Sequence, residues 1–249
     1  MHKYINAFLQ KLFGIRIQRV EKQTEQKSEN RRLNKAIYVE FVGTPGVGKT
    51  TICKKAQKIA NIWNGNNILN NCNSTDIQNS LFYKMLAKQK LVNVTNQDLS
   101  DLDKMFLLGY FHKILVNDFI INKCNNGIVV TDEGLVHNFD DEIFTLINDN
   151  ATYINEFIKK RVIIYCYANP QVVVDRILKR QKETGKLVAY HRNKTREELL
   201  EVEETAQKKK FEIIKFMESL DIPILYVDTS EDLIYNANKV NDFVKSLIK

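Results

Sequence analysis

The sequence predicts an α/β fold in which a parallel β-sheet is flanked by helices, and three observations support that class. Runs of buried-strand type recur along the chain, and longer stretches of helical composition separate them, which is the order that parallel strands need. A glycine-rich turn joins the first of these strands to the helix after it. The 249 residues, 44% of them hydrophobic, are enough for one large α/β domain with a real core.

The net charge of +7 is concentrated in an N-terminal arm, residues 1–35. This arm holds nine Lys and Arg residues but three acidic ones, which leaves 28 basic and 27 acidic residues in the domain that we expect over 36–249. The domain is therefore nearly neutral, which argues against a nucleic-acid-binding function.

The apolar side chains of the arm fall at helical spacing: Ile5, Phe8, Leu9, Leu12 and Phe13. With basic residues around them, they predict a short amphipathic helix. Such a helix would let residues 2–20 contact an anionic membrane or a partner protein. Packing on the domain itself, or a flexible arm, are the alternatives.

The sequence lacks the features of secreted and membrane-spanning proteins, which predicts a cytoplasmic protein. If the arm binds lipid, the protein would be peripheral at the inner face of the membrane. The four cysteines form no C-x-x-C motif, no signal peptide is visible, and no apolar run is long enough to span a bilayer. The sequence leaves open whether the protein forms a homodimer.

The first strand, Ile37–Val42, runs directly into a Walker A motif, G-x-x-x-x-G-K-T. A segment of helical composition follows, so the motif has the strand–loop–helix context that it requires. We expect ATP to bind at Gly43, Thr44, Pro45, Gly46, Val47, Gly48, Lys49, Thr50 and Thr51. The glycines let backbone N–H groups form an anion nest, Lys49 reaches the β- and γ-phosphates, and the Thr50 hydroxyl ligates Mg²⁺.

A second buried strand ends in two carboxylates, Asp132 and Glu133, as in a Walker B motif. Asp132 is expected to hold Mg²⁺ through water, since open α/β sheets bind ligands at the carboxyl ends of their strands. Glu133 has three interpretations: an outer residue of the metal site, a general base on an acceptor hydroxyl, or a base on water. An ordinary acidic strand end is the simpler alternative for both.

Two P-loop classes are disfavoured by their missing motifs. The D-x-x-G spacing fails because Gly134 follows Asp132 one residue too early, and Asn238–Asn241 lacks the aspartate of N-K-x-D. A guanine-specific GTPase is therefore not expected, and no ABC signature occurs. A phosphotransferase and a Walker-B ATPase remain.

The third strand, Arg161–Tyr167, leads to a helix with Asn169 as N-cap and Pro170 at its first position. On that helix Arg176 and Arg180 are four residues apart and share a face. A loop carrying Arg192 follows. These arginines predict a helical lid that closes over the transferring phosphoryl group, with a solvated basic face as the alternative.

The rest of the chain is expected to form a charged helix over about 195–220, a strand over 222–228, and a last helix. Thr229 and Asp232 are expected to form a capping-box variant before that last helix.

These motifs together resemble the P-loop kinases of the nucleoside and nucleoside-monophosphate kinase group, nearest to thymidylate-kinase-like proteins. The matching pieces are the Walker A loop, Val129–Gly134, the R-x-x-x-R helix and Asp228–Asp232. The resemblance covers about residues 36–249 and implies a P-loop NTPase fold with a parallel five-stranded sheet. The fifth strand would come from residues 67–71.

One departure from this group concerns the acceptor. Thymidylate-kinase-like proteins carry an arginine that grips the acceptor phosphate, on the helix before the Walker B strand. This chain has no arginine between Arg32 and Arg161, and Glu133 stands where the group has another arginine. A neutral hydroxyl acceptor is therefore favoured over a monophosphate, with lysine as a substitute clamp at Lys84, Lys88 or Lys113.

The sequence therefore predicts an ATP- and Mg²⁺-dependent small-molecule kinase acting on a nucleoside, nucleotide or sugar hydroxyl. Its proposed catalytic residues are Lys49, Glu133, Arg176 and Arg180. The alternative is a regulatory ATPase docked to a membrane or partner through residues 2–20. Tyr110, Phe111 and His112 are candidate acceptor contacts, although core packing is favoured for residues at this helical spacing. His137 is a further candidate, although a surface position is favoured for it.

Overall fold

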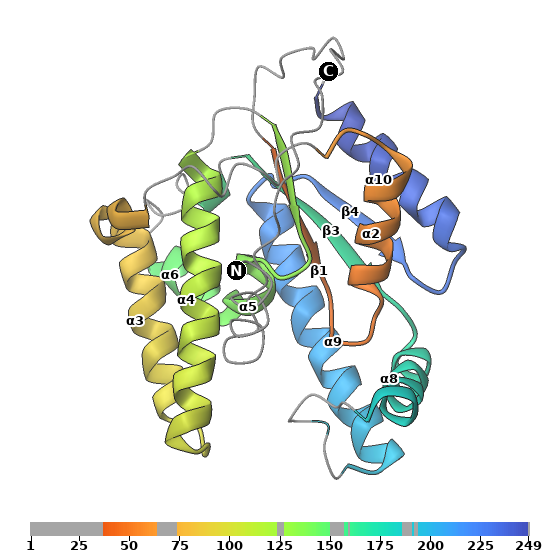
Figure 1. The fold of residues 1–249 in the computed structure, drawn as a ribbon, viewed down its shortest axis with the longest axis horizontal. Helices are drawn as coiled ribbons and strands as arrows, with labels where there is room; N and C mark the ends of the chain where they lie inside the picture. Colours follow the sequence, from red (N-terminus) through yellow and green to blue (C-terminus); the bar gives the residue numbers. More distant parts are fainter. Residues whose placement is uncertain are drawn as a thin grey trace, which may run out of the picture. The chain divides into compact units, whose positions relative to one another are not determined.

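The computed structural model describes residues 37–63, 74–123, 127–149, 157–158, 160–185, 191 and 194–248 (Figure 1). The predicted arm, the predicted fifth strand and Arg192 lie outside these residues. In chain order the elements are β1 (Ile37–Val42), α2 (Lys49–Ile59), the 3₁₀ helix η2 (Ser74–Asn79), α3 (Leu81–Thr95), α4 (Asp101–Lys123), β2 (Ile128–Thr131), α5 (Leu135–Asn138), α6 (Asp140–Asp149), β3 (Arg161–Tyr167), α8 (Pro170–Thr184), α9 (Arg196–Ser219), β4 (Ile224–Asp228) and α10 (Leu233–Ser246).

The described strands form one parallel sheet in the order β2-β1-β3-β4. This arrangement confirms the predicted α/β fold of the P-loop NTPase type, with four strands in the described part. Strand β1 lies between β2 and β3, and Glu40 is in register with Thr131 of β2. The carboxyl ends of β1 and β2 therefore meet at one edge, which brings the loop after Val42 beside the acids after Thr131.

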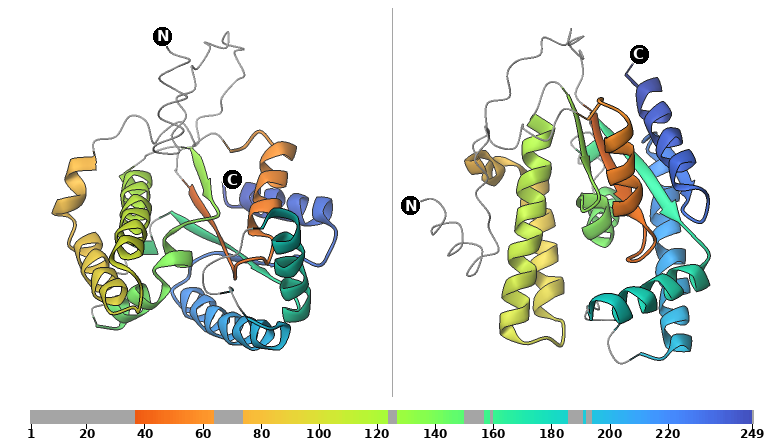
Figure 2. Two further views of the ribbon diagram at one scale, coloured as in Figure 1. Left: turned by 60° about the horizontal axis from the view of Figure 1, so that its bottom comes forward. Right: turned by 45° about the vertical axis from the view of Figure 1, so that its right-hand side comes forward.

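The two faces of the sheet are covered by different helices because successive side chains of a strand point to opposite sides. Ile163 and Tyr165 of β3 pack in the core with α3, α4, α5, α6 and α9. Ile164 and Cys166 pack in the other core with α2, α8 and α10. Figures 1 and 2 show α3 beside α4 on one side of the sheet and α2 beside α10 on the other. None of the described helices is both long and apolar enough to cross a bilayer.

Side chains cap the starts of α8 and α9, whereas one cap predicted from the sequence is wrong. Asn169 accepts a hydrogen bond from the Gln171 N–H and Pro170 opens α8, as predicted. Thr195 and Glu198 form a capping box at the start of α9. The prediction that Thr229 helps to cap the last helix is wrong, because α10 starts at Leu233 with Asp232 alone as its cap.

A buried ion cluster ties β1, β3 and α4 together, and nothing in the sequence pattern indicated it. The guanidinium of Arg161 lies 2.7 Å from Oε2 of Glu40 and 2.8 Å from Oδ2 of Asp118. All three side chains are fully buried. Glu40 also accepts the backbone N–H of His137 at 2.8 Å, so this cluster anchors the segment that follows β2.

Candidate active site

The loop between β1 and α2 curls at positions that only glycine can occupy. Gly46 has a φ of 89°, and a Cβ there would lie 2.7 Å from a side-chain carbon of Ile177. A Cβ on Gly43 would overlap the carbonyl oxygen of Cys166. The backbone can therefore approach both β3 and α8 closely, and this curled form is the one in which P-loop N–H groups bind phosphate oxygens.

Lys49 lies inside this loop as a buried cation. It is 6% exposed, and its ammonium donates to the carbonyl oxygens of Gly43 at 2.9 Å and Thr44 at 3.1 Å. Burial lowers the pKa of Lys49, and the Glu133 carboxylate opposes that shift. A buried ammonium held by neutral carbonyls is poorly compensated, so a triphosphate fits this site by charge as well as by shape.

Thr50 and Asp132 meet across the sheet edge. The Thr50 hydroxyl donates a hydrogen bond to Oδ2 of Asp132, although 82 positions separate them. A hydroxyl and a carboxylate beside a phosphate site form the oxygen donor set that Mg²⁺ prefers. The residues predicted to hold the metal therefore come together and fit a magnesium ion.

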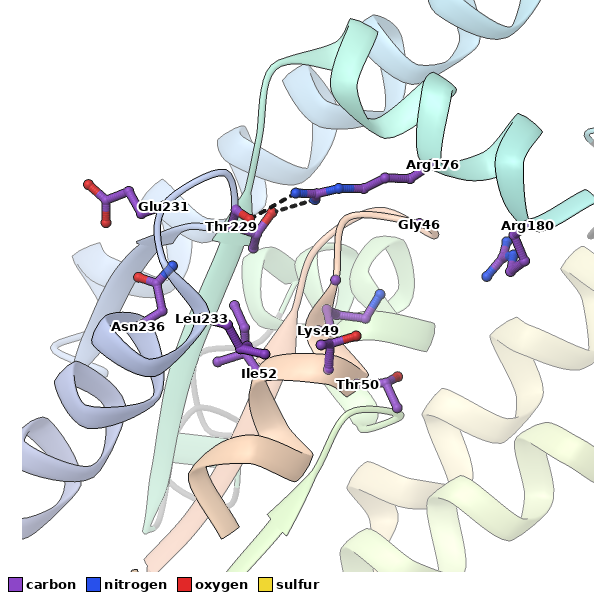
Figure 3. Close-up of a pocket in the computed structure, with 12 residues that line it drawn as sticks. Gly46, Lys49, Thr50, Ile52, Arg176, Arg180, Thr229, Glu231, Leu233 and Asn236 are labelled. Atoms are coloured by element: carbon purple, nitrogen blue, oxygen red, sulfur yellow. Dashed lines mark hydrogen bonds between the residues drawn. The ribbon is translucent and has the colours of Figure 1, made fainter. Parts of the chain in front are cut away.

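Arg176 and Arg180 extend from α8 along the loop but differ in their contacts. The Arg176 guanidinium donates to the Thr229 hydroxyl and to the Thr229 carbonyl, both at 2.9 Å (Figure 3). It also donates to the Val47 carbonyl at 2.9 Å. It thus joins α8, the P-loop and the turn after β4. Figure 3 shows Arg180 well apart from Thr229, on the side of Thr50. Arg180 makes no ion pair with any residue of the described chain.

Two clefts open on either side of this loop. The first has a volume of about 470 Å³ and is lined by α8 and the turn after β4 as well as the loop. Its side chains outside the P-loop come from Ile52, Arg176, Arg180, Thr229, Glu231, Leu233 and Asn236. The second cleft, of about 580 Å³, lies toward α4, α5 and α9 and includes Thr44 and Pro45. Lys49, Thr50, Gly46 and Arg180 line both clefts, so the two meet at the phosphate site.

Glu133 projects into the second cleft and is half exposed. Its Oε2 accepts a hydrogen bond from the Tyr110 hydroxyl at 2.7 Å and lies 3.8 Å from Nε2 of His137. Burial and then the hydrogen bond to Glu133 raise the pKa of Tyr110. Burial and then the charges of Lys49 and Lys210 hold the pKa of His137 well below its usual value. Glu133 is therefore a half-exposed carboxylate of this cleft, held by Tyr110 close to the neutral side chain of His137.

Tyr110 and His137 both line this cleft, contrary to the favoured expectations. Tyr110 is not a core residue: it is 40% exposed and contacts Glu133. His137 is not a surface residue: its side chain is 13% exposed. The suggested substitute clamps, Lys84, Lys88 and Lys113, are all exposed and do not line the cleft.

Sequence reasoning missed Glu203 of α9, a buried carboxylate that contacts the P-loop. The Thr44 hydroxyl and the Gln207 amide both donate to its Oε1, the amide at 2.8 Å. Burial raises the pKa of Glu203, and the Thr44 hydrogen bond opposes that shift. Glu203 stands in a helix of alternating charges, where a buried acid gives no local signal.

The fold and the loop define the chain as a P-loop NTPase. The chain belongs to the AAA domain family, whose model matches residues 39–201. That span begins in β1, contains the whole P-loop, and ends in α9. A search of curated proteins found no match to the sequence.

Several solved structures are similar to the chain at low identity. Deoxyadenosine kinase from M. mycoides with bound dCTP is 16% identical, with a TM-score of 0.44; the match covers 84% of this chain and 100% of that one. The same M. mycoides enzyme with bound products is 18% identical, with a TM-score of 0.45 and the same coverage. A candidate kinase from Chloroflexus aurantiacus is 16% identical, with a TM-score of 0.41; the match covers 86% and 98% of the two chains. Similarities this low carry no inference about substrate.

Proposed function

We propose that the protein is an ATP- and Mg²⁺-dependent kinase that phosphorylates a hydroxyl group of a small molecule. One observation carries the proposal: two separate clefts meet at Lys49, Thr50 and Arg180, and the second contains a carboxylate. Phosphoryl transfer needs a donor and an acceptor on opposite sides of one phosphate site. The thymidylate-kinase-like assignment and the nucleoside, nucleotide or sugar nature of the acceptor belong to this proposal.

The first cleft is the proposed ATP site. Lys49 and the P-loop N–H groups bind the β- and γ-phosphates, and Thr50 and Asp132 hold Mg²⁺. When bound there, Mg²⁺ supplies positive charge to the phosphate oxygens. Arg176 is bonded to the loop and to Thr229, so it is proposed to fix the wall of this cleft. Arg180, and Arg192 beyond the described residues, are proposed to close over the transferring group.

Glu133 is the proposed general base for the acceptor hydroxyl. The acceptor oxygen forms a bond to the γ-phosphorus, the bond from that phosphorus to the β–γ bridging oxygen breaks, and ADP leaves. The hydroxyl proton passes to Glu133. Tyr110 fixes the orientation of that carboxylate through its hydrogen bond to Oε2, which leaves Oε1 for the acceptor.

Phosphoryl transfer into a pool of cell-extract metabolites, followed by mass spectrometry, tests the proposal. A metabolite should gain one phosphoryl group with the unmutated protein and with Lys54→Ala, an exposed lysine on the same helix. The same product should be absent with Lys49→Ala, because the buried ammonium in the loop is lost. Product that still forms with Lys49→Ala would be independent of the P-loop and would overturn the assignment.

The regulatory ATPase remains the second outcome of this experiment. In that case Glu133 activates water, and residues 2–20 contact a membrane or a partner. It predicts Lys49-dependent phosphate release without any phosphorylated metabolite, and a response of that release to anionic vesicles. A chain without residues 1–35 would lose the response but keep the release.

A further inference from the structure

Apart from Lys49 of the P-loop, the lysines that line the second cleft lie on helix α9, and each of them is already paired. Nζ of Lys209 lies 2.6 Å from Oδ2 of Asp141, and Nζ of Lys210 lies 2.5 Å from Oδ2 of Asp140. Lys210 also donates to the His137 carbonyl and is only 9% exposed. To bind either ammonium group, an anion in the cleft would have to break the ion pair between that group and its carboxylate. The carboxylate would then be left without a cation close to the anion and would repel it.

The other basic groups near the cleft offer no substitute. His137 lines the cleft, but burial and the two neighbouring ammonium groups keep its imidazole neutral. Lys49 and Arg180 make no ion pair within the described chain, yet both lie where the two clefts meet. Bound ATP would therefore occupy these two cations, and no other unpaired cation among the described residues that line the cleft would remain for a phosphate on the acceptor.

The cleft instead presents groups that accept hydrogen bonds, beside aromatic rings. Oε1 of Glu133 accepts no hydrogen bond from any described residue. The side chains of Asp140 and Asn138 add further oxygens, each of which already accepts one hydrogen bond within the chain. The rings of Tyr110 and Phe111 form part of the wall. Carboxylate and amide oxygens next to aromatic faces suit a ligand that donates several hydrogen bonds and carries no negative charge.

We infer that the acceptor is an uncharged polyhydroxyl compound, such as a nucleoside or a free sugar, and that phosphate esters are excluded from the cleft. The inference rests on the proposed kinase function and specifies its substrate class. The two ion pairs between α9 and the start of α6, Lys209 with Asp141 and Lys210 with Asp140, exclude the esters.

Inorganic phosphate is the probe for the first test, because it needs no knowledge of the acceptor. Its binding is measured by calorimetry with Mg²⁺ and a non-hydrolysable ATP analogue present, so that the P-loop is filled. The unmutated protein should show no saturable binding. Asp140→Asn with Asp141→Asn should free both lysines and tighten phosphate binding at least about tenfold, as charge-assisted hydrogen bonds would. Adding Lys209→Gln and Lys210→Gln to that variant should abolish the gain.

Two results would overturn the inference. One is phosphate binding to the unmutated protein that the lysine substitutions remove, since the pairs would then not block anions. The other is an Asp140→Asn, Asp141→Asn variant that is folded by circular dichroism yet gains no binding. If that variant does not fold, Asp141→Asn alone serves, because its ion pair with Lys209 is half exposed.

The second test compares each accepted metabolite with its own phosphate ester. The uncharged compound should have a kcat/KM at least about tenfold higher, which corresponds to 1.4 kcal/mol. An ester that reacts as well as its parent compound would overturn the inference while leaving the kinase assignment intact. A failed metabolite screen, in contrast, would count against the kinase alone, because the phosphate-binding test needs no turnover.

Discussion

Replacing Arg161 by methionine should be among the most damaging single changes in the described part of the chain. The substitution keeps a long side chain but removes the one cation between Glu40 and Asp118. Those two carboxylates are 0% and 1% exposed, so water cannot take over the role of the guanidinium. They would remain buried with one partner lost.

The expected cost follows from these contacts. Arg161 makes two short ion pairs and also donates to the Phe157 carbonyl at 3.3 Å. Removing one partner of a buried pair costs roughly 3–5 kcal/mol because the uncompensated charge stays in the interior. That is a large part of the roughly 5–15 kcal/mol that stabilises an ordinary domain. Arg196→Met is the matched control: its pair with Asp175 is exposed on both sides and should contribute less than about 1 kcal/mol.

The cost should depend on pH with a defined sign. Burial already raises the pKa of Glu40, and Arg161 opposes that shift, so the substitution raises this pKa further. A carboxyl group whose pKa is higher in the folded than in the unfolded state destabilises the fold once it is ionised. The penalty of Arg161→Met should therefore be full near neutral pH and should shrink as pH falls toward the ordinary glutamate range.

Urea unfolding followed by circular dichroism measures these differences as shifts in the midpoint. Adding Glu40→Gln and Asp118→Asn to Arg161→Met should recover part of the lost stability, since no buried charge remains. A loss below about 1 kcal/mol for Arg161→Met, with no pH dependence, would refute the reasoning.

Three further predictions follow from single contacts. In the unfolded chain His137 becomes protonated below about pH 6.5, whereas burial keeps it neutral in the folded chain. As the pH decreases below that value, the free energy of unfolding should therefore decrease by up to about 1.4 kcal/mol per pH unit. His137→Gln should flatten this part of the urea-measured pH profile, and an unchanged slope would contradict the assignment. Glu203→Gln and Thr44→Val should each raise the KM for ATP in steady-state assays, and the double variant should be no worse than the poorer single one; additive losses would mean that the two side chains act separately. Thr195→Ala should cost about 1 kcal/mol in urea unfolding because it removes the α9 capping box, whereas Thr195→Ser should keep most of that stability.

The parts of the site that the sequence predicted are those set by neighbours along the chain. Gly43–Thr50, the acids after β2 and the start of α8 at Asn169 each carry their chemistry within a few residues. A strand, a tight turn and a cap can therefore be inferred from spacing alone. The carboxyl ends of parallel strands then bring Thr50 and Asp132 together without any further information.

The parts that it could not predict depend on contacts between distant segments. Thr44 and Glu203 are 159 positions apart, and Arg161 and Glu40 are 121 apart. Local periodicity does not encode such pairs, and a charge in a strand or an alternating helix has the same pattern whether it is buried or solvated. The prediction that Tyr110 packs in the core is wrong for a related reason. Its spacing suits a core helix, but α4 extends beyond the ends of the strands (Figure 1). Tyr110 therefore lines the cleft instead of packing on the sheet.

The size of the second cleft bears on the choice between kinase and ATPase. A hydrolytic enzyme needs room for one water beside Glu133, whereas this cleft has a volume of about 580 Å³ and walls from several elements. Water in so large a cleft would compete with the acceptor for the γ-phosphoryl group. Only an acceptor that fills the cleft would exclude this water. A kinase built in this way should release phosphate slowly without an acceptor, and its true acceptor should suppress that release while it is being phosphorylated. The ratio of phosphorylated product to free phosphate therefore ranks acceptors by how completely they fill the cleft, independently of how tightly they bind.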